Sequence, residues 1–107
     1  MAAYGRSGPA ELSAVEARQA VDGGAFLLDV READEWAAGH VPDAVHVPMS
    51  QLAGRVDELP TDRTIVCVCH VGARSAAVAD ALNRGGWTAV NLAGGMVAWE
   101  AAGLPVV

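Results

Sequence analysis

The sequence of 107 residues contains no lysine, only two cysteines, and no hydrophobic run long enough to cross a membrane. Seven arginines stand against 13 acidic residues, so the net charge is −6 at pH 7 with histidine neutral. This acidic balance argues against a surface for nucleic acid or for anionic membranes. Because the overall field repels anions, any anion that the protein binds must meet local positive charge.

The two cysteines, Cys67 and Cys69, are separated by a single valine. Cysteines this close together cannot join distant parts of a fold, and their scarcity is typical of a reducing compartment. The first residues, "MAAYGRSGPAELS", lack the apolar core of a signal peptide. We therefore expect the protein to be cytoplasmic, with neither a membrane nor a nucleic acid among its partners.

Three short, mostly apolar segments are the strongest signals of secondary structure. Residues 25–30, 64–69 and 88–92 are each predicted to form a strand that is buried on both faces. The segment bracketed by Pro42 and Pro48 is predicted to be extended and to contain one short strand. With 52% hydrophobic residues and a mean hydropathy of +0.26, the chain is expected to fold as one domain.

Helical patterns alternate with these strands. Helices are predicted over residues 11–21, 31–40, 50–60, 74–84 and, as a short helix, within 94–107. Ser50 is expected to cap the third of them. Strands that alternate with helices are joined by right-handed crossovers, which predicts an α/β fold with a mainly parallel sheet covered on both faces. Residues 1–8 are expected to be a flexible tail, followed by a single domain over residues 9–107.

The stretch "IVCVCHVGARSAA" places Cys69 at the end of a predicted strand, with the next helix beginning near Arg74. In a parallel sheet, functional residues gather where strands end and helices begin. Backbone N–H groups and the helix dipole would point at the Cys69 sulfur and lower its thiol pKa from about 8.5 toward neutrality. Gly72 allows the loop to curl tightly, and Arg74 offers a positive charge to an anion.

Cys67 lies inside the predicted strand and is interpreted as a structural core residue. A disulfide with Cys69 is not expected, because residues i and i+2 of a strand lie near the upper limit of bridging distance. The run "CVCH" lacks the Cys-x-x-Cys spacing and the second ligand cluster of a metal site, and His40 and His46 could join it only by a coincidence of the fold. We predict neither a metal nor a cofactor.

Four motifs occur in order along the chain: "LLDVREADEWAAGHVPDAVHVP", "IVCVCHVGARSAAVADAL", "AVNLAGG" and "GGMVAWEAAGLPV". With them the chain resembles a single-domain rhodanese-like sulfurtransferase along nearly its whole length. The resemblance implies a mainly parallel five-stranded sheet that is flanked by helices on both faces. It also implies an enzyme that moves sulfane sulfur without a cofactor.

The resemblance assigns the role of nucleophile to Cys69, which would carry the sulfur as a persulfide. It implies a substrate-binding loop made of His70, Val71, Gly72, Ala73 and Arg74. It gives Asp29 and Arg31, from the "DVR" motif, a supporting role. The donor would be thiosulfate, a small sulfur anion, or a persulfide, and the acceptor would be cyanide or a thiol, including a protein thiol such as that of thioredoxin.

The sequence departs from the family pattern at two positions. Asp43 replaces a usual glycine, and because aspartate tolerates turn geometry we expect little effect. His70 replaces a frequent arginine, so the substrate-binding loop carries less permanent charge. We expect this loss of charge to weaken the use of thiosulfate.

Several of these residues also have a purely structural interpretation. Asp29 can cap the next helix or pair with an arginine, His40 can pack or cap at the end of a helix, and Arg74 can be a helix-surface residue. The tryptophans are predicted to pack between helices and sheet: Trp36, Trp87 and Trp99.

Two other functions remain as alternatives. A non-catalytic rhodanese-like module for protein interaction would usually lack the loop cysteine, which this chain retains. Cysteine-dependent phosphatases place five residues between nucleophile and arginine, whereas four separate Cys69 from Arg74. The shorter loop makes a smaller cradle, which favours sulfur over phosphate.

Overall fold

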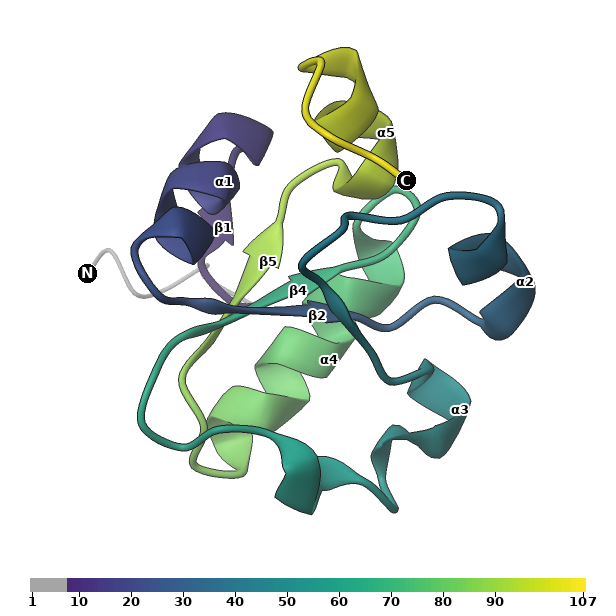
Figure 1. Cartoon of the computed structure of the whole chain (residues 1–107). Coiled ribbons are helices and arrows are strands. Elements are labelled where there is room, and N and C mark those ends of the chain that lie inside the picture. The colour runs from purple at the N-terminus through teal and green to yellow at the C-terminus, as the bar shows by residue number, and fades with distance from the viewer. Residues whose placement is uncertain (1–7) are drawn as a thin grey trace.

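The computed structural model describes residues 8–107, so the predicted tail lies, apart from Gly8, outside the described residues. The strands form one sheet in the order β1-β5-β4-β2-β3, and every neighbouring pair is parallel (Figure 1). The strands are β1 (Glu11–Leu12), β2 (Phe26–Asp29), β3 (Val45–His46), β4 (Ile65–Val68) and β5 (Ala89–Leu92). The predicted five-stranded α/β fold is confirmed.

Five helices connect and cover the strands. They are α1 (Ala14–Asp22), α2 (Ala33–Ala37), α3 (Met49–Leu52), α4 (Ala73–Arg84) and α5 (Gly95–Ala101), with a 3₁₀ turn, η1 (Val56–Glu58), after α3. In Figure 1, α1 and α5 lie above the sheet and α4 crosses below it. Among the described residues, no helix combines the length and the apolar character needed to span a bilayer.

The residues of β4 divide the core between the two faces of the sheet. Ile65 and Cys67 belong to the buried cluster that includes side chains of α3 and α4. Val66 and Val68 belong to the second cluster, which includes side chains of α1 and α5. Because both faces are covered, successive residues of the strand are all buried, which explains the continuous apolar run in the sequence.

The three predicted apolar strands correspond to β2, β4 and β5, and the short strand expected between the prolines is β3. The strand β1 was not predicted, because its two residues were assigned to the first helix. That helix begins later, at Ala14, because Ser13 caps it: Ser13 Oγ accepts from Glu16 N at 3.1 Å, and Ser13 N donates to Glu16 Oε1 at 2.8 Å.

The prediction of one helix over residues 50–60 capped by Ser50 is wrong. The helix α3 begins at Met49, directly after Pro48, and the chain then continues into the separate turn η1. Gly54, a poor helix former, lies between the two. Ser50 is inside α3 and its hydroxyl donates to Glu32 Oε1 at 2.8 Å.

Asp43, one of the two departures from the family pattern, lies on the surface between α2 and β3. Its carboxylate pairs with Arg18 of α1, with Arg18 Nη2 donating to Asp43 Oδ2 at 2.8 Å. This hydrogen bond holds the pKa of Asp43 below its ordinary value. The aspartate therefore ties α1 to the loop before β3.

We predict that Cys67→Ser lowers the free energy of unfolding by about 1–3 kcal/mol, because it buries a hydroxyl in an apolar cluster. Urea unfolding measures the change. Cys67→Ala is the matched control, since alanine is smaller than serine but apolar. A larger loss for alanine than for serine would show that volume, and not the buried hydroxyl, determines the cost.

Candidate active site

The loop between β4 and α4 encloses the side chain of Cys69. As predicted, this residue follows directly after β4, and it is buried, with only 1% of the residue exposed. Cys69 Sγ accepts hydrogen bonds from Gly72 N at 3.1 Å and from Ser75 Oγ at 3.3 Å. The loop therefore folds back over Cys69, and its later residues contact the Cys69 sulfur.

Gly72 makes this closure sterically feasible. It is the N-cap of α4 and has φ +107°, a left-handed conformation that favours glycine. A Cβ at this position would also lie 3.2 Å from Gly94 N, closer than most contacts of a real Cβ. The expectation that the loop needs glycine here is therefore confirmed.

The start of α5 fixes the loop from the other side. Met96 N donates to Cys69 O at 2.8 Å, and Val97 N donates to His70 O at 3.1 Å. Gly95 lies so close to the loop that a Cβ there would overlap the carbonyl oxygens of Cys69 and His70. The first N–H groups of α5, which have no partner within the helix, are thus satisfied by the loop.

The two cysteines have opposite acid–base character. Burial alone raises the pKa of the Cys69 thiol. Hydrogen bonds from the Ser75 hydroxyl and from backbone N–H groups of Ser75, Gly72 and Arg74 outweigh it, so the pKa is lowered. Burial raises the pKa of the Cys67 thiol to about 12. Both cysteines are free thiols, and the predicted division into a reactive Cys69 and a buried Cys67 agrees with these shifts.

A buried polar chain behind Cys69 was missed in the sequence. Ser75 Oγ donates to Asn91 Oδ1 at 2.6 Å, so the one hydrogen of this hydroxyl is shared between Asn91 and the Cys69 sulfur. Asn91 Nδ2 donates to Gly72 O at 3.1 Å and to Glu11 Oε2 at 2.9 Å. Ser75 and Asn91 are both buried. The position of the Ser75 hydroxyl beside the sulfur therefore depends on β5 and on β1, 80 positions from Asn91 in the sequence.

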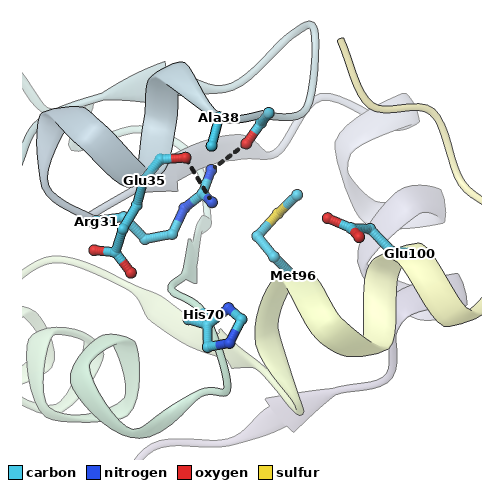
Figure 2. Close-up of a pocket in the computed structure, with 7 residues that line it drawn as sticks. Arg31, Glu35, Ala38, His70, Met96 and Glu100 are labelled. Atoms are coloured by element: carbon cyan, nitrogen blue, oxygen red, sulfur yellow. Dashed lines mark hydrogen bonds between the residues drawn. The ribbon is translucent and has the colours of Figure 1, made fainter.

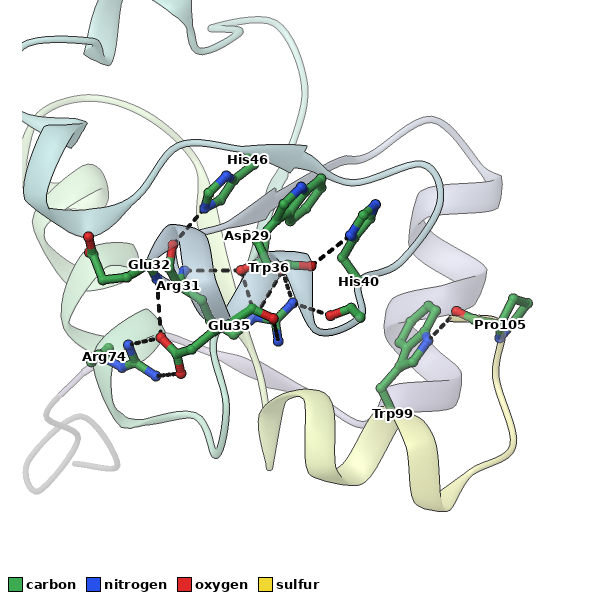
Figure 3. A network of polar contacts seen from close by, with 11 residues as sticks. Asp29, Arg31, Glu32, Glu35, Trp36, His40, His46, Arg74, Trp99 and Pro105 are labelled. Carbon is green, nitrogen blue, oxygen red and sulfur yellow. Dashed lines mark hydrogen bonds and ion pairs between the residues drawn. The ribbon is translucent and has the colours of Figure 1, made fainter. Parts of the chain in front are cut away.

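Asp29 and Arg31 form a buried ion pair beneath α2 (Figure 3). Arg31 Nη2 donates to Asp29 Oδ2 at 2.8 Å and to Gly39 O at 2.8 Å, and Arg31 Nη1 donates to Glu35 O at 3.2 Å. The guanidinium thus holds the middle of α2 and the turn that follows it against the end of β2. Of the two structural interpretations of Asp29, the structure shows the pairing with an arginine.

Arg74 is held by Glu35 of α2. Its Nη1 and Nη2 donate to the two carboxylate oxygens of Glu35 at 2.8 and 2.7 Å (Figure 3). The hydrogen bonds from Arg74 lower the pKa of Glu35 to about 2 despite the opposing effect of burial. The pKa of Arg74 is raised, mainly by Glu35 and to a smaller extent by the nearby Cys69. In this structure the predicted anion-binding arginine already has an anionic partner.

A cavity of about 310 Å³ lies beside the loop (Figure 2). It is lined by Arg31, Glu35, Ala38, Gly39, His70, Met96 and Glu100. His70 is the predicted loop residue that lines it, whereas Val71 is 58% exposed and Cys69 lies under the loop. The contributions of Glu35, Met96 and Glu100 were not predicted, because nothing in their spacing relates them to the cysteine.

The predicted packing roles of the aromatic residues are partly visible around α2. Trp36 stacks on His40 with ring centroids 3.6 Å apart and on His46 at 4.6 Å (Figure 3). His40 Nδ1 also donates to Trp36 O at 2.9 Å, as expected for a packing and capping residue. Trp99 is buried in the core cluster that contains side chains of α1 and α5.

Within residues 8–107, no cluster of His, Cys, Asp and Glu is arranged to hold a metal.

We predict that Ser75→Ala raises the pKa of Cys69, because it removes the hydroxyl that donates to the sulfur. The pH dependence of iodoacetamide alkylation measures this pKa. Ser50→Ala, which removes a surface hydroxyl, is the control. An unchanged titration in a folded Ser75→Ala protein would show that the hydroxyl does not stabilise the thiolate.

We also predict that the pair of Glu35 and Arg74 makes stability depend on pH. The folded-state pKa of Glu35, about 2, lies below its ordinary value of 4.5. The pair therefore stabilises the fold above pH 4.5, and this contribution is lost as the pH falls from 4.5 toward 2. The difference in unfolding free energy between wild type and Glu35→Gln should shrink over this interval.

Urea unfolding at successive pH values tests this prediction. The same measurement in an Arg74→Ala background is the control, because Glu35 then has no guanidinium partner and the pH-dependent difference should largely disappear. A difference that stays constant through the interval would contradict the assignment.

Comparison with known proteins identifies the family. The model of the rhodanese-like domain matches residues 13–102. A sulfurtransferase of Allochromatium vinosum is 42% identical over 83 residues, covering 77% of this chain and 78% of that protein. The putative sulfurtransferase YtwF of Bacillus subtilis is 41% identical over 75 residues, covering 70% and 73%.

The fold comparison agrees. A crystal structure of a rhodanese-related protein from Thermoplasma volcanium has a TM-score of 0.86 and 30% identity, and the match covers 92% of this chain and 97% of that one. At the level of the family, the matched domain and the names of these relatives support sulfur transfer. With the fold, the cysteine loop and the family model in agreement, the chain belongs to the rhodanese-like domain family.

Proposed function

We propose that the protein is a sulfurtransferase that carries sulfane sulfur as a persulfide on Cys69. The observation that supports this most directly is the enclosure of the Cys69 sulfur, which accepts hydrogen bonds from Gly72 N and Ser75 Oγ. These donors favour the thiolate, which is the nucleophilic form of cysteine. The adjoining cavity, with His70 in its wall, offers space for a donor molecule.

The proposed reaction has two displacement steps. The Cys69 thiolate attacks the outer sulfur of the donor, a sulfur–sulfur bond forms on Cys69, and the donor leaves with the electron pair of its own broken bond. With thiosulfate the leaving group is sulfite, and with a persulfide it is a thiolate. In the second step a thiolate or cyanide attacks the outer sulfur, and the Cys69 thiolate is regenerated.

The acceptor we propose is a thiol, either of a small molecule or of a protein such as thioredoxin, with cyanide as an alternative acceptor. We place the reaction in the cytoplasm, since a free thiol at Cys69 is maintained in a reducing compartment. We propose that the loop residues His70, Val71, Gly72, Ala73 and Arg74 bind the transferred sulfur, with the backbone N–H of Gly72 already donating to Cys69 Sγ. Asp29 and Arg31 support the site by holding α2 in place.

The two alternative functions receive less support from this geometry. A non-catalytic interaction module has no need of a thiol whose pKa is lowered by loop donors. In a phosphatase the arginine of the loop would bind the phosphate, but Arg74 is paired bidentately with Glu35. Four residues between Cys69 and Arg74 also leave a smaller loop than the phosphatase spacing does.

We predict that Cys69→Ser abolishes persulfide formation while the protein remains folded, because serine is nearly isosteric but its hydroxyl is a poor nucleophile at neutral pH. Intact-mass spectrometry after incubation with a sulfur donor would show one added sulfur atom on the wild type and none on the variant. Release of that sulfur to cyanide as thiocyanate confirms its sulfane character.

Cys67→Ala is the matched control and should still acquire the sulfur, since the Cys67 thiol is buried with its pKa raised to about 12. If Cys69→Ser acquires sulfur and Cys67→Ala does not, the roles of the two cysteines are reversed. If the wild type acquires none from thiosulfate or from persulfides, the proposed function is wrong.

A further inference from the structure

The cavity beside the catalytic loop has acidic groups on opposite sides. Glu35 of α2 and Glu100 of α5 stand on either side of Met96, with His70 below and Ala38 above in the view of Figure 2. Glu35 is neutralised by Arg74. Among residues 8–107, no ion pair involves Glu100, so its charge is not compensated there.

Arg31, the cation in the wall of this cavity, is fully committed to the protein. Its guanidinium pairs with the Asp29 carboxylate and donates to the carbonyl oxygens of Glu35 and Gly39. Releasing Arg31 to a ligand would leave the carboxylate of Asp29 buried without its partner, which is costly. The guanidinium therefore does not serve as a mobile partner for a bound anion.

The other described cations are also engaged. Within residues 8–107, five of the six arginines form ion pairs with carboxylates: Arg18, Arg31, Arg55, Arg74 and Arg84. The sixth, Arg63, precedes β4 and lies at the amino-terminal end of the strand, away from the loop. There it donates to Gly24 O and lies over the ring of Phe26. Among residues 8–107, Arg74 is the arginine next to the loop, and a dianion that paired with it would displace Glu35.

We propose that this cavity selects its sulfur donor by charge: it takes a persulfide whose carrier has no second anionic group near the sulfur, and it disfavours dianions such as thiosulfate. This inference rests on the proposed sulfur transfer and narrows its donor class. Ala38 and the buried Met96 make part of the cavity wall apolar, and Glu100 repels a second negative charge. The same charge favours a carrier that bears an ammonium group.

The charges of the reacting groups also favour a persulfide donor over thiosulfate. When the Cys69 thiolate attacks R–S–SH, the new bond joins Cys69 Sγ to the outer sulfur, the R–S bond to that sulfur breaks, and R–S⁻ leaves with the electron pair. One negative charge is present before and after the step. With thiosulfate the same displacement brings three negative charges together, and sulfite leaves with two of them. The two arginines at the cavity, Arg31 and Arg74, are already paired with carboxylates and do not offset the difference.

Three persulfides of matched length test the proposal. They are prepared in place from sulfide and the disulfides of 2-aminoethanethiol, 2-mercaptoethanol and 2-mercaptoethanesulfonate, so that the carriers differ mainly in end-group charge. The rate of sulfur addition to Cys69 is measured by quenched intact-mass spectrometry, with thiosulfate as a fourth donor. The rate of sulfur addition is expected to be highest for the amine, lower for the hydroxyl and lowest for the sulfonate. The amine and the sulfonate should differ by about tenfold at low salt.

Two variants distinguish the effect of the carboxylate in the cavity wall from the effect of the net charge of the protein. Glu100→Gln should reduce the ratio of the hydroxyl to the sulfonate rate severalfold, because it removes the uncompensated carboxylate from the cavity wall. Asp62→Asn changes the net charge by the same amount, but Asp62 precedes β4, at the opposite end from the loop. This variant should leave the ratio unchanged.

Three results would overturn the proposal. Faster sulfur addition from thiosulfate or from the sulfonate than from the hydroxyl persulfide would show that the cavity binds anions, while the proposed sulfur transfer would stand. An equal effect of Glu100→Gln and Asp62→Asn would show that overall charge alone acts. Failure of all four donors to add sulfur to Cys69 would remove the proposed function and this inference with it.

Discussion

The hydrogen bonds from the start of α5 to the cysteine loop are the interaction on which the site depends. Met96 N and Val97 N hold the carbonyl oxygens of Cys69 and His70. Because each peptide group is planar and trans, the N–H groups that follow these carbonyls must point away from α5. These are the N–H groups of His70 and Val71, and the next one along the loop, that of Gly72, donates to the Cys69 sulfur. A side chain at Gly95 would separate α5 from the loop and remove this constraint.

A second constraint acts through α2, a helix of only five residues. Such a short helix has little stability of its own. It is held in place by Arg31, which binds the carbonyl oxygens of Glu35 and Gly39, and by the pair of Glu35 with Arg74. The same contacts occupy both guanidinium groups near the cavity. The arginines there therefore serve to build the site, and in our proposal the acidic residues determine which ligands the cavity accepts.

The sequence predicts the central strands and the reactive cysteine because both depend on local pattern. A strand covered on both faces is mostly apolar, and a residue at its carboxyl end lies next to the start of the following helix. The polar contacts that tune the site are not local. Glu35 and Arg74 are 39 positions apart, and Asn91 and Glu11 are 80 apart, so no spacing connects them. The strand β1 was equally hidden, because two residues show no periodicity.

The position of Cys67 bears on the survival of a persulfide at Cys69. A neighbouring thiolate that attacked the inner sulfur of such a persulfide would form a disulfide and expel hydrosulfide. Cys67 belongs to the same buried cluster as Cys69, but burial raises its pKa to about 12. At neutral pH it is therefore almost entirely the unreactive thiol, and the strand spacing also disfavours the bridge. Burial of Cys67 in this way would protect the persulfide that we propose for Cys69.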